Sequence, residues 1–210
     1  DNPLAAIQFY DDAHAALAWA VLSTGTFYLA PLEGSAIADE LARIHPRELL
    51  YVETANSTPP PRIQALVEAQ GCSAVARPGW QFHAQEAREM LCKHYQVATL
   101  AGFGLGEHLD HLGPAAAVVH YLLETQCAGS QSSTTGRRAL AHLQPPRLFV
   151  RQAHLVIDQA SLRALEIERT TRSLSSQGSL LDILQDCRTA MGKRLLRHWL
   201  CYPLCDADAI

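Results

Sequence analysis

Two groups of side chains have the residue types that a metal site would need. The first group has two imidazoles and a carboxylate within one short segment: His108, Asp110 and His111. The second has an imidazole and two thiols near a predicted helix end: His198, Cys201 and Cys205. Structural zinc is held by four convergent ligands, usually including closely spaced cysteine pairs, and neither group supplies these locally. We therefore expect surface histidines and free thiols at both places, and no metal-binding residue.

Glycine-rich segments are the next candidates, because such loops can cradle phosphates. Gly129 and Gly136 bracket a Ser/Thr-rich loop, but six residues separate them and Arg-Arg follows. A P-loop has four residues between its glycines, followed by Lys and then Ser or Thr. Gly102–Gly106 lacks the last spacing of the G-x-G-x-x-G fingerprint. Ser23 and Ser35 lie near glycines, although neither forms G-x-S-x-G. The sequence thus predicts no catalytic and no cofactor-binding residue.

Composition indicates a globular protein. The chain has 210 residues, of which 48% are hydrophobic and 18% charged, as in ordinary soluble domains. No run approaches the roughly 20 apolar residues of a membrane span, and no signal peptide is recognisable. Because the first residue is not Met, we expect a piece of a longer protein, in the cytoplasm. The six cysteines form no C-x-x-C pair, so we expect free thiols.

The net charge of -4 is unevenly distributed along the chain. Residues 1–136 carry 6 Lys and Arg against 14 Asp and Glu, whereas residues 137–210 carry 11 against 7. An acidic surface repels a phosphate backbone and a basic one attracts it. The second half is therefore the part expected to lie nearer to DNA, if either does.

The first half alternates strand-like and helix-like segments. The predicted strands are Ala5–Tyr10, Ala16–Leu22, Thr26–Leu29, Leu49–Val52 and Ala74–Ala76. The predicted helices are Ile37–Ile44, Pro61–Gln70, Ala84–Tyr95 and Ala115–Leu123. Short strands around Gly25 favour an antiparallel meander, and the last helix is apolar almost all round, which indicates deep burial. His120 on that helix is expected to be a core or partner-facing residue.

The second half begins with a change of composition. Cys127–Arg138 is small and polar, which is typical of a loop or linker. Arg147–Val150 is expected to be extended, and the chain is expected to be helical from Ser161 onward. Ser179, with Asp182 three residues later, predicts a capped helix start.

An amphipathic helix is predicted at the end of the chain. Met191, Leu195 and Trp199 recur at i, i+4 and i+8, whereas basic residues occupy the other faces. Pro203 ends the helix, because proline has no backbone donor and clashes with the preceding turn. This spacing predicts that Trp199 is a buried packing anchor.

The same helix carries a family signature. Thr189–Leu204 matches T-x-M-G-x-R-L-L-x-x-W-L-x-x-P-L and resembles the early part of the helical core domain of MutS-type mismatch-repair proteins. Asp158–Ile167 resembles the segment that opens this domain, with Ala164 in place of the usual Asn.

The first half also resembles this family. Asn2–Ile7 is similar to the beginning of the MutS connector domain, and Ala18–Phe27 to its second and third strands. Val21 stands where the family has Asp. Arg47–Tyr51 resembles P-x-E-L-L-x, and Ala115–Gln126 resembles a helix that ends in Y-L-x-x-T-Q.

This resemblance implies a fold and a domain order. An α/β RNase H-like connector domain is expected over residues 1–128, with a flexible linker or insertion over 129–146. Residues 147–210 are then the N-terminal part of an all-α core domain, truncated in this chain.

The resemblance also implies a function. The chain is expected to connect mismatch-binding and ATPase domains, structurally and allosterically, and to offer a docking surface for a MutL-type partner. It is not expected to be an enzyme by itself, since the ATPase region is absent. The intact parent is expected to bind ATP and Mg²⁺, to form a homodimer on mismatched double-stranded DNA, to associate with the nucleoid in the cytoplasm, and to have no membrane partner.

Two alternatives remain open on the residues alone. A metal-dependent nuclease on an RNase H-like scaffold needs several carboxylates that converge on paired divalent ions. The predicted first strand contains no acid; Asp11 and Asp12 follow it in a turn, and Val21 replaces an acid of the family. The other alternative is a stand-alone interaction module.

Overall fold

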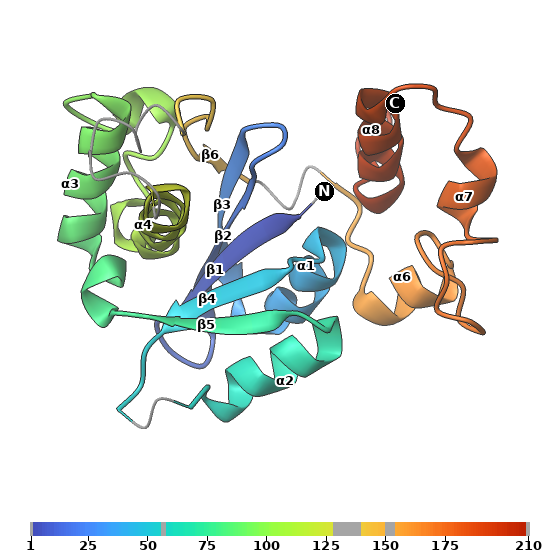
Figure 1. Cartoon of the computed structure of the whole chain (residues 1–210), viewed down its shortest axis with the longest axis horizontal. Coiled ribbons are helices and arrows are strands. Elements are labelled where there is room, and N and C mark those ends of the chain that lie inside the picture. The colour runs from blue at the N-terminus through green and yellow to red at the C-terminus, as the bar shows by residue number, and fades with distance from the viewer. Residues whose placement is uncertain (1, 56–57, 128–139, 150–153, 209–210) are drawn as a thin grey trace. The chain divides into compact units, whose positions relative to one another are not determined.

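The computed structural model describes residues 2–55, 58–127, 140–149 and 154–208. The chain divides into two compact units, Asp1–Phe149 and Val150–Ile210, and each is described here by itself (Figure 1).

The first unit is built on a six-stranded mixed sheet of order β5-β4-β1-β2-β3-β6. The strands are β1 (Pro3–Phe9), β2 (His14–Val21), β3 (Thr26–Glu33), β4 (Glu48–Val52), β5 (Ser73–Arg77) and β6 (Arg147–Leu148). The first three strands form an antiparallel meander, as predicted. β4 pairs parallel with β1 and with β5, and β6 pairs parallel with β3. The first unit is therefore a mixed α/β domain.

Helices cover both faces of this sheet. They are α1 (Ile37–Ile44), α2 (Pro61–Gln70), α3 (Ala84–Tyr95) and α4 (Gly113–Cys127). The bounds of the first three are those predicted from the sequence. Proline is well tolerated at the start of α2, because the backbone N–H of the first helical residue has no hydrogen-bond partner within the helix. α1 and α3 end where His45 and Gln96 adopt the left-handed conformation, and the N–H groups of both residues bond back into the helix.

The alternation of side chains along β1 separates two cores. Leu4 and Ala6 point into the core that contains α4, and Ala5 and Ile7 point into the core that contains α1. Since successive strand residues face opposite sides of a sheet, a strand covered on both faces must be apolar throughout. Pro3 to Ile7 are accordingly all buried.

α4 is the central helix of one core. Its residues from Gly113 to Val119 are buried, which confirms the burial predicted for Ala115–Leu123 over most of that segment. The helix approaches the sheet closely at Gly113, where an added Cβ would lie 2.3 Å from Gln8 Oε1 and 2.4 Å from the Phe82 carbonyl oxygen. Glycine is therefore the residue that lets α4 begin against β1.

Part of the predicted linker belongs to the first unit. Residues 128–139 lie outside the described residues, and most of the predicted loop Cys127–Arg138 lies there with them. Farther along, Leu140 and Leu143 are buried in the core around α4. The extended stretch predicted for Arg147–Val150 is confirmed for Arg147–Leu148, which form β6, whereas Val150 lies outside the described residues.

The second unit contains three described helices: α6 (Gln159–Ala164), α7 (Leu180–Leu184) and α8 (Ala190–Cys201). Each has a side-chain cap: Asp158 accepts from the Ser161 N–H, Ser179 from Asp182 and Thr189 from Gly192. The cap at Ser179 confirms the predicted helix start.

The prediction of helix from Ser161 onward was wrong between α6 and α7. Residues 165–179 form turns, in which Glu166, Leu174 and Gly178 have positive φ angles. The Glu166 carboxylate accepts bonds from the Thr171 N–H and hydroxyl, which stabilise one of these turns. Such side chain–backbone bonds compete with the helical pattern.

The predicted burial of Trp199 was also wrong. α8 forms with nearly the predicted bounds, but Trp199 is 62% exposed and Met191 is 78% exposed. Within the described part of the second unit, burial on α8 is instead greatest at Cys201, which is 1% exposed. Periodicity had identified the apolar stripe correctly, yet the stripe faces solvent.

No helix among the described residues is long and apolar enough to span a membrane.

A substitution at Gly113 tests the close approach of α4. Gly113→Ala is expected to destabilise the chain by about 1–3 kcal/mol, since the methyl group has no space beside backbone atoms of Phe82. Gly102→Ala is the matched control, because no atom lies within 4 Å of the Cβ it would add. Urea unfolding of both variants measures the difference, and equal midpoints would contradict this packing.

Two tryptophans provide a matched test of burial. Trp19 is 6% exposed and stacks on Tyr28 with ring centroids 5.2 Å apart. Trp19→Ala is expected to cost about 3–5 kcal/mol, whereas Trp199→Ala should change stability by less than about 0.5 kcal/mol. Chemical unfolding, together with acrylamide quenching of Trp199 in a Trp19→Phe/Trp80→Phe background, distinguishes the two. Strong protection of Trp199 from acrylamide would show that its side chain is buried, as the sequence predicted.

Candidate functional site

The first predicted donor group lies in a short helical turn before α4. The ring centroids of His108 and His111 are 6.3 Å apart, and His111 packs edge-on against Tyr10 at 5.1 Å. Burial lowers the pKa of His111, and the neighbouring His108 lowers it further. The described residues contain no cluster of three or more His, Cys, Asp or Glu that could hold a metal. This group is therefore an aromatic contact between the turn and the end of β1.

The second donor group does not converge on a metal either. Cys201 is buried and Cys205 is exposed. His198 packs against Tyr202, with ring centroids 5.1 Å apart, and burial lowers its pKa. His154 Nδ1 lies 3.1 Å from the Tyr202 carbonyl oxygen, and Leu155 donates to the Pro203 carbonyl. These contacts tie an extended segment to the end of α8.

Asp11, one of the two acids that follow the first strand, has a structural role. Asp11 accepts from the Ala13 and His14 N–H groups at 2.7 and 2.6 Å, and its other oxygen lies 2.9 Å from His14 Nδ1. The His14 interactions lower the pKa of this carboxyl. Asp11 thus stabilises the turn between β1 and β2. The described residues bring no acid set together, so the nuclease alternative has no support in this geometry.

The glycine-rich segment 102–106 is a structural connection. Gly104 adopts a positive φ of 75° and ends a short helical turn, and Leu105 is fully buried. The segment Gly129–Gly136 lies outside the described residues. His120, on α4, packs edge-on against Trp80 at 5.0 Å, and burial lowers its pKa.

A polar network that the sequence did not reveal fixes α4 to the sheet. The Tyr121 hydroxyl donates to Glu48 at 2.5 Å, and Arg77 contacts Glu124 at 2.6 Å. The Arg77 guanidinium also lies over the Tyr121 ring, 5.5 Å from its centroid. The hydrogen bond to Glu48 raises the pKa of Tyr121 to about 12. α4 is therefore held to both β4 and β5 by charged or hydrogen-bonded pairs.

The signature helix α8 has its own polar contact. Arg197 Nε lies 2.5 Å from Glu168 Oε1, and both side chains are about two-thirds shielded from water. The pair joins α8 to the turns that precede α7. Lys193 is exposed on the same helix, beside the apolar stripe of Met191 and Trp199. The ion pair thus positions α8 against these turns, whereas the side chains of the apolar stripe remain exposed to solvent.

Two family models match the chain in succession. One, MutS domain II, matches residues 2–143, and the other, MutS domain III, matches residues 160–210. The first match covers β1 to β5 and α1 to α4, and the second covers α7, α8 and all of α6 but its first residue.

Curated relatives agree with these matches. The DNA mismatch repair protein MutS of Rhodopirellula baltica is 38% identical over 195 residues, which are 92% of this chain and 20% of the relative. The proteins of the same name from Synechococcus elongatus and Syntrophomonas wolfei are 34% and 32% identical, each over 100% of this chain. The chain spans only about a quarter of the length of these two relatives.

The resemblance seen in the sequence, from the strands of the first half to the signature of α8, is therefore confirmed, and the chain belongs to the MutS family.

Proposed function

We propose that the chain is the connector domain and the beginning of the core domain of a DNA mismatch-recognition protein. The observation that carries this proposal is the succession of the two family matches over a mixed α/β unit and a helical unit. In this proposal the chain performs no chemistry. It links a part of the parent protein that reads DNA to a part that binds nucleotide.

We also propose that the first unit has an RNase H-like fold. The strand order β5-β4-β1-β2-β3, with an antiparallel meander and two parallel strands added beside β1, supports this assignment. Such a scaffold without convergent acids acts as a support and not as a nuclease, because function resides in the site and not in the fold.

The connector role is supported by how rigidly the elements are joined. Coupling between distant sites requires packed elements that move as units between alternative arrangements. α4 is bound to the sheet through Tyr121–Glu48 and Arg77–Glu124, and α8 is bound to its neighbouring turns through Arg197–Glu168. In this proposal, a displacement at one end of either helix is passed to the elements that it contacts.

For the intact parent, the proposal extends to cofactors and partners. It would bind ATP and Mg²⁺ outside this chain, act as a homodimer on mismatched double-stranded DNA in the nucleoid, and recruit a MutL-type protein. The first unit is a candidate for the docking surface of that protein. These assignments are what the resemblance to the MutS family implies, and the names of the relatives support only a role in DNA mismatch repair.

The isolated chain tests whether ATP hydrolysis and mismatch recognition belong to other parts of the parent protein. It is expected to hydrolyse neither ATP nor nucleic acid, and to bind duplex DNA weakly, with a dissociation constant of about 10⁻⁴ to 10⁻⁶ M that rises with salt. The intact parent should bind a G·T duplex far more tightly. Fluorescence anisotropy on paired and G·T duplexes measures both. Tight, salt-insensitive mismatch discrimination by the chain alone would contradict the domain assignment.

The ion pair on α8 tests the coupling. In the intact parent, Arg197→Ala is expected to change the rate of ATP-induced release from a G·T duplex by about 3-fold or more. The dissociation constants for ATP and for the duplex should stay within about 2-fold. Arg188→Ala, an exposed cation in the connection before α8, is the matched control. Stopped-flow release kinetics give the comparison; an effect of equal size in both variants would argue against a specific role of the pair.

A further inference from the structure

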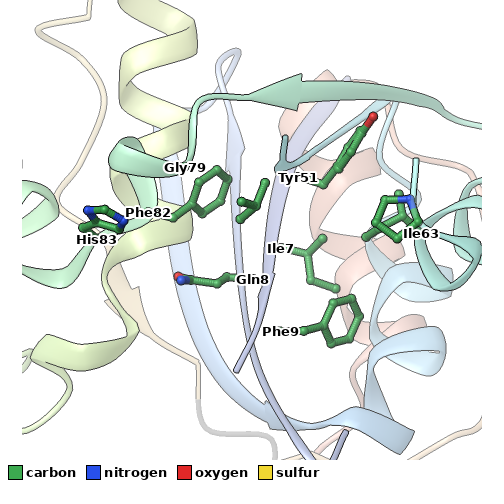
Figure 2. A pocket seen from close by; sticks show the side chains of 10 residues that line it. Ile7, Gln8, Phe9, Tyr51, Ile63, Gly79, Phe82 and His83 are labelled. Atoms are coloured by element: carbon green, nitrogen blue, oxygen red, sulfur yellow. The ribbon is translucent and has the colours of Figure 1, made fainter. Parts of the chain in front are cut away.

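A cavity of about 360 Å³ lies beside β1 in the first unit (Figure 2). Ile7, Tyr51 and Ile63 line it from the core around α1, whereas Phe82 belongs to the core around α4. Gln8 follows Ile7 along the strand and therefore points to the α4 side. The sheet thus separates the amide from the apolar walls, and those four apolar side chains expose at most 4% of their surface. This cavity therefore offers no single surface to a ligand.

A cluster of three rings in the second unit joins two segments that are far apart in the sequence. His154 comes before α6, whereas His198 lies on α8 and Tyr202 follows that helix. The ring centroids of His154 and His198 are 6.1 Å apart, and those of His154 and Tyr202 are 5.8 Å apart. His154 and His198 are the two histidines in the sequence of this unit. The imidazole is the side chain that ordinarily changes its charge between pH 5 and pH 8.

Backbone contacts accompany these rings. His154 Nδ1 lies 3.1 Å from the Tyr202 carbonyl oxygen, and since a carbonyl only accepts, Nδ1 carries the proton. The Leu155 N–H donates to the Pro203 carbonyl at 2.8 Å, and His154 forms an isolated β-bridge with Leu204. We call these contacts and the three rings the histidine clasp. The clasp fastens the segment before α6 to the end of α8.

The surroundings of His198 disfavour its protonated form. Burial lowers the pKa of His198, and the neighbouring His154 and Arg197 lower it further. Arg194 adds another cation one turn earlier on α8. Glu168 is paired with Arg197 at 2.5 Å, and no carboxylate among the described residues contributes to the lowered pKa of His198. A proton on this ring thus places a positive charge beside other cationic or protonatable groups.

The sign of the pH effect follows from this lowered pKa. An unperturbed histidine has a pKa of about 6.5, so the open clasp binds the proton of His198 more tightly than the closed clasp does. The stability that the neutral ring contributes is fully present above about pH 6.5 and is lost as the pH falls through the lowered pKa. Acid therefore favours the open clasp.

We propose that the histidine clasp is a pH-dependent fastening within the second unit. At neutral pH it holds residues 154–155 against the end of α8, and protonation of His198 releases them. The pair Arg197–Glu168 is a separate contact, which joins α8 to the turns before α7. Release of the clasp thus frees one attachment of the signature helix and not the other. The device does not depend on the connector role.

Hydrogen exchange of the Leu155 amide in the whole chain tests the proposal, because its bond to the Pro203 carbonyl belongs to the closed clasp. Its protection factor, which corrects for the intrinsic effect of pH on exchange, is expected to fall about 3-fold or more from about pH 7.5 to about pH 5.5. The Leu181 amide donates to the Ile167 carbonyl at 2.9 Å and is the internal reference. Its protection should stay within about 2-fold. No loss at Leu155, or an equal loss at both amides, would overturn the proposal.

A variant at His198 makes the test specific. His198→Phe keeps an aromatic ring beside Tyr202 but takes up no proton, so the protection of Leu155 should change by less than about 1.5-fold over the same pH range. His83→Phe, at an exposed histidine of the first unit, is the matched control and should retain the full change. If His198→Phe also retained the full change, another group would be responsible and the proposal would be wrong.

Direct titration of the unaltered chain covers the case in which His198→Phe does not fold. The imidazole C–H signals of His198, followed by NMR, should give a pKa below the ordinary value of about 6.5. The protonation of this ring should also occur in the pH range over which Leu155 loses its protection. A pKa at or above the ordinary value, or a loss of protection in a different pH range, would contradict the assigned role of His198.

Discussion

Burial of β1 on both faces is the constraint on which the first unit depends. The strand must offer apolar side chains to two separate cores, and Ala5 and Ala6 do so with side chains small enough for helices to approach. α4 takes one face and meets the strand at Gly113, where backbone atoms leave no space for a side chain. The position of α4 then determines where Tyr121 and Glu124 reach the sheet.

The sequence predicted local structure well where local chemistry decides it. α1, α2 and α3 have the predicted bounds, and the predicted cap at Ser179 begins α7. Sequence could not reveal the network around α4, because Tyr121 and Glu48 are 73 residues apart, and Arg77 and Glu124 are 47 apart. No local pattern marks such pairs, since only the sheet order brings them together.

The two errors have different physical origins. Helical periodicity reports which side of a helix is apolar, but not whether another element covers that side. Trp199 therefore looked buried, although it is 62% exposed. The second error concerns residues 165–179, which contain no strong helix breaker until Gly178. The turns there depend on the bonds from Thr171 to Glu166 and on the positive φ angles of Glu166 and Leu174.

The solvent-facing stripe of α8 has a consequence for every solution measurement on the second unit. An apolar surface that includes Met191 and Trp199 lowers its free energy whenever any other surface covers it. By linkage, whatever binds the folded form adds to its apparent stability in proportion to the logarithm of its concentration. The melting temperature of this unit therefore depends on the composition of the sample as well as on the chain. Detergent, further copies of the chain and neighbouring domains each raise it when they cover the stripe.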